Sequence, residues 1–195
     1  MSLKQTIYSV LIVSASDTFT SSLVAALPES RFQPIHKVRD CSSAGRTLAE
    51  REYDLILINS PLPDGNGQPL AIDICSSRSS VVLMMIRSEL HEQVRDKVSA
   101  YGVFTLPKPV TRPMFLTAVE WMAAARERLR KNEARTQSIQ EKMEEIRLVN
   151  RAKWLLIQEL KMEEPQAHRY IEKQAMDQCV TKKEIAQNLI RIYGK

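Results

Sequence analysis

The feature that most constrains the fold is a long segment without glycine or proline, the two residues that most disfavour helix interiors. Pro113 and Pro165 bound this segment. It predicts one long helix from about Arg112 to Leu160, which at 1.5 Å per residue would extend roughly 70 Å. A helix of that length cannot pack wholly against a domain of this size, so we expect part of it to need a partner.

Apolar and small residues recur along this segment at alternating steps of three and four, the spacing of a coiled-coil seam. Ala125, Asn132 and Thr136 weaken its middle, which could bend or open. We expect a parallel homodimer through this coiled coil, although the part from Phe115 to Met122 also fits a helix packed on the preceding domain. The seam positions are Phe115, Ala118, Met122, Ala125, Leu129, Asn132, Thr136, Ile139, Met143, Ile146 and Asn150.

Before Lys108 the pattern consists of short apolar, β-rich runs. Three of them, at Ile7–Val13, Asp54–Asn59 and Val81–Ile86, are separated by segments long enough for crossover helices. Buried parallel strands joined in this way predict a doubly wound α/β sheet. We therefore expect three parts: an α/β domain at 1–112, a linker helix at 113–148 and a small helical domain at 149–195.

Two strings in the first part resemble a response-regulator receiver domain. They are YDLILINSPLPDGNG at Tyr53–Gly67 and LPKP at Leu106–Pro109. The resemblance extends from residue 6 to about 125 and implies a flavodoxin-like, five-stranded parallel sheet. In that family an Asp at the end of the third strand accepts a phosphoryl group, and this chain has Asn59 there.

The other receiver positions are also altered. Ser14 and Ala15 align with the acidic pair that holds Mg²⁺ in the family, and Ser88 lies near the expected hydroxyl residue. Mg²⁺ needs carboxylate oxygens, and an amide is too poor a nucleophile to form an acyl phosphate. Only Lys108 remains of the family's machinery, so we expect a receiver-like domain that is not phosphorylated, with no metal and no cofactor.

Three acids in this part could stand in for the missing aspartate. Asp17 suits the first turn of a helix that begins near Ser16, Asp54 starts a strand, and Asp64 belongs to a turn with Gly65. We therefore expect structural roles for all three.

The net charge of +5 lies in the second half of the chain. Residues 1–110 hold eleven basic and eleven acidic side chains, whereas residues 111–195 hold seventeen and twelve. Only the second half thus has the excess of positive charge that attracts a polyanion.

The last part predicts three helices. The long helix ends near Leu160, and Pro165 suits the first turn of a second helix. Thr181 and Glu184 have the spacing of a capping box, which predicts the start of a third. Apolar faces are expected at Ala152, Leu155, Leu156, Ala167, Tyr170, Ile171, Ala175, Ile185, Leu189 and Ile190.

This part resembles the ANTAR domain, the RNA-binding module of transcription antitermination regulators. The matching residues are Asn150–Trp154, Ala167 with Tyr170, Gln174–Met176 and Thr181–Ala186, although Trp154 replaces a residue that is often Gly. The resemblance implies a dimer that binds hairpins of leader RNA, prevents a terminator from forming and lets polymerase read through.

RNA loops present phosphates and splayed bases, which call for Arg, Lys and stacking surface. Trp154 and Tyr170 could stack on bases, but their spacing favours the core. His168, which has no nearby metal-ligand partners, is expected to be structural or a polar contact. The expected RNA contacts are Arg151, Lys153, Arg169, Lys173, Lys182 and Lys183, of which we favour the last three.

Other functions fit less well. A DNA-binding two-component regulator would need base-reading side chains on one exposed helix, and the segment from Lys182 to Ile192 offers few. No catalytic constellation or phosphate-cradling glycine loop indicates an enzyme. A scaffold that acts by dimerisation alone would not need the charge of the tail.

The chain is expected in the cytoplasm. Its three cysteines are odd in number, it shows no secretory signal, and its apolar runs are too short for a bilayer. Without phosphorylation, control would come from abundance or from a ligand-sensing protein partner. Such a partner would bind around Leu106–Arg112 or at the weak seam, Asn132–Thr136.

Overall fold

The computed structural model describes residues 6–194 and divides into two compact units, Met1–Lys131 and Asn132–Lys195. Helix α5, Arg112–Leu160, contributes its first part to unit 1 and its last part to unit 2. Within the described range, no helix combines the length and apolar character needed to cross a lipid bilayer.

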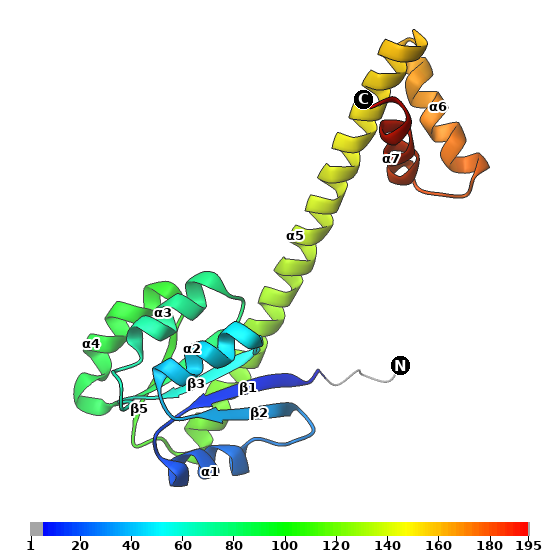
Figure 1. The fold of residues 1–195 in the computed structure, drawn as a ribbon. Helices are drawn as coiled ribbons and strands as arrows, with labels where there is room; N and C mark the ends of the chain where they lie inside the picture. The colour runs from blue at the N-terminus through cyan, green and yellow to red at the C-terminus, as the bar shows by residue number, and fades with distance from the viewer. Residues whose placement is uncertain (1–5, 195) are drawn as a thin grey trace. The chain divides into compact units, whose positions relative to one another are not determined.

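A five-stranded sheet with strand order β2-β1-β3-β4-β5 forms the centre of unit 1 (Figure 1). All neighbouring strands are parallel, which confirms the predicted doubly wound α/β fold. β1, β3 and β4 are almost entirely buried because helices cover both of their faces. The strands are β1 Tyr8–Val13, β2 Phe32–Val38, β3 Leu55–Asn59, β4 Val81–Arg87 and β5 Phe104–Lys108.

Two helical layers bury the sheet. α1 and the first part of α5 pack on one face, and α2, α3 and α4 pack on the other (Figure 1). Phe115, Ala118 and Met122 lie inside the first of these cores, so the first seam positions pack on the domain's own sheet. The helices are α1 Asp17–Ala26, α2 Cys41–Glu50, α3 Gln68–Ser77, α4 Ser88–Val98 and the short 3₁₀ helix Ser99–Tyr101.

Charged groups fix α5 to the N-terminal end of the sheet. Asp54, just before β3, receives hydrogen bonds from Arg126 Nε at 2.9 Å and from Arg130 Nη2 at 2.8 Å. Its second oxygen accepts from the backbone N–H of Ser9 on β1. Burial raises the pKa of the Asp54 carboxyl, but the Ser9 hydrogen bond and the two guanidinium groups outweigh burial and hold that pKa below its usual value.

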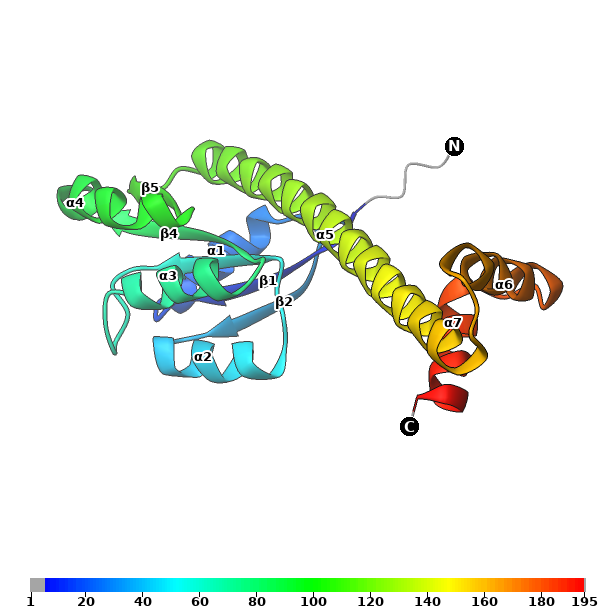
Figure 2. The ribbon, with the colours of Figure 1, turned by 90° about the horizontal axis from the view of Figure 1, so that it is seen from above.

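Unit 2 consists of the end of α5 followed by α6, Glu164–Asp177, and α7, Lys182–Tyr193. Figure 2 shows α6 and α7 beside the last turns of α5, and a shared apolar core holds the three together. Ala152, Ala167, Ala175 and Ala186 are buried in this core, and side chains this small let helices approach closely. The predicted three-helix arrangement is confirmed.

The turns between these helices follow local sequence signals. Thr181 and Glu184 form the predicted capping box at α7, and Pro165 lies in the first turn of α6. Lys161 and Cys179 adopt left-handed backbone conformations, with φ of 55° and 52°, where the chain leaves α5 and α6. These two residues reverse the chain direction without a glycine.

Candidate nucleic-acid interface and the C-terminal edge of the sheet

Asn59 ends β3 at the C-terminal edge of the sheet and is buried. Its amide Nδ2 donates a hydrogen bond to Ser14 Oγ, 2.9 Å away, at the end of β1. Its Oδ1 is buried and has no hydrogen-bond partner among the described residues. The ends of the two strands are thus joined by an amide and a hydroxyl at the place where the receiver resemblance expects carboxylates.

Lys108 ends β5 beside this pair. Its ammonium donates to the carbonyl of Ser60 and lies 5.9 Å from the centre of the Phe19 ring. Burial, and then the charge of Arg87, lower the pKa of Lys108. Ser88 donates its hydroxyl proton to the carbonyl of Lys108 at the start of α4.

Ala15 contributes only its carbonyl, which accepts from Arg39 Nη2 at 3.0 Å. Within residues 6–194, no group of three or more His, Cys, Asp or Glu side chains could hold a metal ion. The groups that sequence comparison aligns with the receiver machinery therefore lie together at this edge, where they hydrogen-bond to one another and to the backbone.

Of the three acids that could stand in for the missing aspartate, Asp54 lies at the opposite, N-terminal end of the sheet, and the other two form contacts near this edge. Asp17 pairs with Arg39 at 3.0 Å. Asp64 accepts hydrogen bonds from the backbone N–H groups of Cys41 and Ser42, each at 2.9 Å, at the N-terminus of α2. These backbone hydrogen bonds lower the pKa of Asp64 to about 2. The sequence predicts Asp64 in a turn but does not predict its contact with α2, because this contact joins residues more than twenty positions apart.

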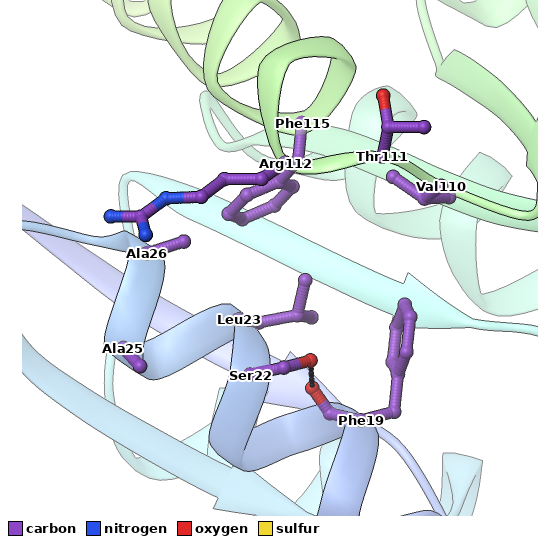
Figure 3. Close-up of a pocket in the computed structure, with 9 residues that line it drawn as sticks. All are labelled: Phe19, Ser22, Leu23, Ala25, Ala26, Val110, Thr111, Arg112 and Phe115. Atoms are coloured by element: carbon purple, nitrogen blue, oxygen red, sulfur yellow. Dashed lines mark hydrogen bonds between the residues drawn. The ribbon is translucent and has the colours of Figure 1, made fainter.

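A pocket of about 340 Å³ lies between α1 and the start of α5. Figure 3 shows the side chains of Phe19 and Leu23 on α1 opposite Phe115 and Val110, with the Arg112 guanidinium directed toward α1. This pocket includes part of the segment Leu106–Arg112, where we expect a partner to bind.

In unit 2, three of the predicted RNA contacts form ion pairs within the chain. Lys153 Nζ lies 2.7 Å from Glu164, Lys182 Nζ lies 2.5 Å from Glu172, and Lys183 Nζ lies 2.6 Å from Glu144. The Lys153 and Lys182 hydrogen bonds lower the pKa values of Glu164 and Glu172, and the Glu144 hydrogen bond raises that of Lys183. These lysines join α5, α6 and α7 to one another.

The other three predicted contacts, Arg151, Arg169 and Lys173, are exposed and form no ion pair with a described residue. Arg169 and Lys173 lie one turn apart on α6, on the side away from its buried residue Ile171. Met176 follows on the same side with 78% of its surface exposed. We call Arg169, Lys173 and Met176 the α6 stripe.

Trp154 departs from the expectation that favoured a core position, because 64% of its surface is exposed. Ala152 and Leu156 lie on the side of α5 that faces the core of unit 2. Trp154 is two positions from each of them, so its side chain points to the opposite side of the helix. Tyr170 packs partly against the core, as expected. His168 is exposed and lies 3.3 Å from Glu172.

Both units are similar to known proteins or domains. Residues 137–190 match the model of the ANTAR domain family. The chain is 24% identical over 185 residues to the transcriptional regulatory protein PdtaR of Mycobacterium tuberculosis, covering 95% of this chain and 90% of the relative.

Solved structures share the fold of unit 1. The signal receiver domain of an HD domain-containing protein from Pseudomonas fluorescens Pf-5 has a TM-score of 0.55 and 22% identity, and covers 69% of this chain and 97% of that one. An adenylate cyclase structure from Rhodopirellula baltica has a TM-score of 0.61 and 14% identity, and covers 67% and 98%. Residues 137–190 therefore form an ANTAR domain, and the N-terminal unit has the receiver-domain fold.

Proposed function

We propose that this chain is a transcription antiterminator that binds hairpin loops of leader RNA through unit 2. The observation that carries the proposal is the α6 stripe, which lies within the ANTAR match and presents two basic groups that form no ion pair within residues 6–194. A guanidinium and an ammonium one helical turn apart can contact successive phosphates, and the exposed Met176 offers apolar surface to a splayed base.

Arg151 extends the proposed interface on α5. The three lysines that form ion pairs with glutamates have a structural role in this proposal, because these pairs hold the helices of unit 2 together. They are Lys153, Lys182 and Lys183. Contact of these lysines with RNA would require an ion pair to open. The primary contacts are therefore Arg169 and Lys173, with Arg151 beside them.

The proposed antiterminator acts as a dimer, since two linked domains bind paired hairpins more tightly than either alone. The support is the exposed part of the seam, where Ile139, Met143 and Ile146 have apolar side chains with no cover in unit 2.

Control in this proposal does not use phosphorylation at position 59. The amide of Asn59 donates to Ser14, and residues 6–194 include no group of three or more His, Cys, Asp or Glu side chains that could hold Mg²⁺. The proposed input is a protein partner that binds at the pocket of Phe19, Val110 and Arg112, which overlaps the segment Leu106–Arg112. A chain regulated by abundance alone is the alternative.

A binding titration tests the RNA proposal. The full chain is titrated into labelled RNA hairpins with randomised loops and into duplex DNA of equal length, over a series of salt concentrations. We expect hairpins to be preferred, and the Arg169→Ala/Lys173→Ala double variant to bind at least about tenfold more weakly with a reduced salt slope.

The matched control is Lys97→Ala with Arg95→Ala, which removes two exposed positive charges from α4 in unit 1. This variant should bind hairpins as the wild type does. Equal loss in both variants would mean that net charge alone drives binding, and a preference for duplex DNA would contradict the proposal.

A further inference from the structure

The pocket between α1 and the start of α5 extends into the apolar core of unit 1 (Figure 3). Its volume of about 340 Å³ lies within the range of pockets that bind small molecules. Leu23 and Phe115 are its most buried lining residues, with 4% and 2% of their surfaces exposed. Phe19 and Val110, both half-buried, line it as well. The pocket is therefore a recess with mainly apolar walls.

The end of α1 leaves this recess open. Ala25 and Ala26 line it with single methyl groups, and Figure 3 shows Ala26 facing the start of α5. Protein cores are close-packed and contain few voids larger than a water molecule. A recess of this size, bounded by side chains that belong to the core, therefore has room for an apolar group from outside the chain.

The guanidinium of Arg112 is the side-chain polar group of this pocket that has no partner among the described residues. The hydroxyl of Ser22 donates to the carbonyl of Phe19 at 2.7 Å. The hydroxyl of Thr111 accepts a hydrogen bond from the backbone N–H of Met114 at 3.4 Å. Arg112 is exposed, is directed toward α1 and forms no ion pair within residues 6–194. Since no described Asp or Glu lines the pocket, its charge favours an anion.

We infer that the pocket binds a small carboxylate with an aliphatic or aromatic body, which packs against Leu23 and Phe115 while the carboxylate pairs with Arg112. A guanidinium binds a carboxylate through two parallel hydrogen bonds, and such charge-assisted pairs are stronger than neutral ones. The apolar walls supply most of the contact, and Arg112 fixes the orientation of the ligand.

A phosphate-rich ligand fits this pocket poorly. RNA and nucleotides are bound by several positive groups, because each phosphate carries its own charge. Here a single guanidinium lies beside apolar side chains. Burial of a phosphate against Phe19 and Val110 would cost desolvation energy, and the pocket has no second cation among the described residues to offset that cost. The lining and its charge therefore select a monoanion with a large apolar part.

As a site of control, the pocket rests on the proposed function, whereas ligand binding itself does not. A ligand that contacts α1 and α5 together stabilises the present spacing of these helices. The ring centre of Phe19 lies 5.9 Å from the Lys108 ammonium, so the ligand site adjoins the C-terminal edge of the sheet. The ligand and the protein partner proposed above exclude one another, because both require the same recess.

A methyl NMR titration of the full chain tests the site, with phenylacetate as the probe. Leu and Val methyl groups are labelled. We expect saturable shifts at Leu23 and Val110, with a dissociation constant on the order of 1 mM for a probe of this size. The methyl groups of Leu156 and Leu189, in the core of unit 2, should not shift. Absence of saturable shifts at Leu23 and Val110, or equal shifts in both units, would overturn the inference.

Phenylacetamide, a neutral probe of similar shape, tests the part of Arg112. The wild-type chain should bind it at least about tenfold more weakly than phenylacetate, because the charge-assisted pair is lost. Arg112→Gln should weaken phenylacetate binding to that level and leave phenylacetamide binding unchanged. The matched control is Arg128→Gln, an exposed arginine farther along the same helix, which should bind both probes as the wild type does. Equal affinity of the wild type for the two probes, or equal loss in both variants, would contradict the inference.

Ala26→Leu fills the recess and should abolish the binding of both probes. The matched control is Ala124→Leu, an exposed position of α5 outside the pocket, where both probes should still bind. Thermal unfolding should show both variants folded, since each added side chain enters open space. Phenylacetate that binds Ala26→Leu as tightly as the wild type would place the ligand elsewhere and overturn the inference.

Hairpin titration of the same chain separates this site from the proposed function. Saturable shifts at Leu23 and Val110 in a chain that binds no hairpin would refute the proposed function and leave the ligand site standing. Hairpin binding in a chain without these shifts would overturn the ligand site alone.

Discussion

Asn59 and Ser14 join the ends of β3 and β1 through one hydrogen bond, at the place where the receiver resemblance expects carboxylates. A carboxylate at position 59 would add a nucleophile, but without Mg²⁺ it could not offset the charge of an incoming phosphoryl group. The neighbouring Ser14 and Ala15 supply no carboxylate oxygen. If unit 1 is not phosphorylated, as we propose, the absence of metal ligands therefore matters as much as the absence of the acceptor.

We predict that Asn59→Asp alone is not labelled by acetyl phosphate with Mg²⁺, because no ligands hold the metal. Asn59→Asp combined with Ser14→Asp and Ala15→Asp should be labelled, since the combination restores an acceptor and carboxylates together. Intact-mass spectrometry after incubation gives the measurement. Labelling of the wild-type chain at this edge would contradict the account.

A second residue-scale prediction concerns Asp54, whose charge faces Arg126 and Arg130. Asp54→Asn should lower the free energy of unfolding of unit 1 by about 2 kcal/mol, because it removes the charged acceptor of partly buried hydrogen bonds from two guanidinium groups. The control is Asp73→Asn, an exposed position on α3, which should change little. Chemical denaturation near neutral pH provides the comparison.

The same residue predicts a pH dependence. Because the pKa of Asp54 is lowered in the folded chain, its stabilising contribution is complete above the unfolded pKa of about 3.9 and declines as pH falls through the lower folded value. Wild type should therefore lose more stability than Asp54→Asn as the pH is lowered from about 5 to about 3. Equal losses would show that this carboxylate does not stabilise the contact.

Elements differ in how far the sequence predicts them. The buried strands β1, β3 and β4 could be placed to within one residue at each end, because strands covered on both faces are continuous apolar runs. The edge strands β2 and β5 could not be delimited in this way. Their side chains are mostly half-buried or exposed, so no apolar run marks them.

The candidate interface could be predicted only in part. Charge and the ANTAR resemblance indicate which basic residues are candidates for RNA contact. They do not indicate which of these residues face glutamates on another helix. The pairs of Lys182 with Glu172 and of Lys183 with Glu144 depend on how α5, α6 and α7 pack. The spacing of Trp154 favours a core position, but spacing alone does not show which side of α5 the neighbouring helices cover, and the side chain is exposed.

At the element scale, the start of α7 depends on the Thr181 cap, whose hydroxyl accepts from the Glu184 backbone N–H. Thr181→Ala should lower the stability of unit 2 by about 1 kcal/mol. The control is Thr117→Ala, an exposed interior position of α5, where alanine should be neutral or slightly stabilising. Thermal unfolding followed by circular dichroism distinguishes the two variants.

The whole molecule combines a unit with the receiver fold, a helix that continues from it and a small domain that matches the ANTAR family. We propose that the α6 stripe binds hairpins of leader RNA and so prevents termination. Charge, exposure and the ANTAR match support that claim at a surface free of catalytic groups.

The most direct test is transcription in vitro from a leader recovered with the chain from its native cell. Adding the full chain without a phosphoryl donor should increase read-through at the terminator. The Arg169→Ala/Lys173→Ala variant should need at least about tenfold more protein for the same effect. Read-through that does not respond to the chain, or that the double variant supports equally well, would contradict the account.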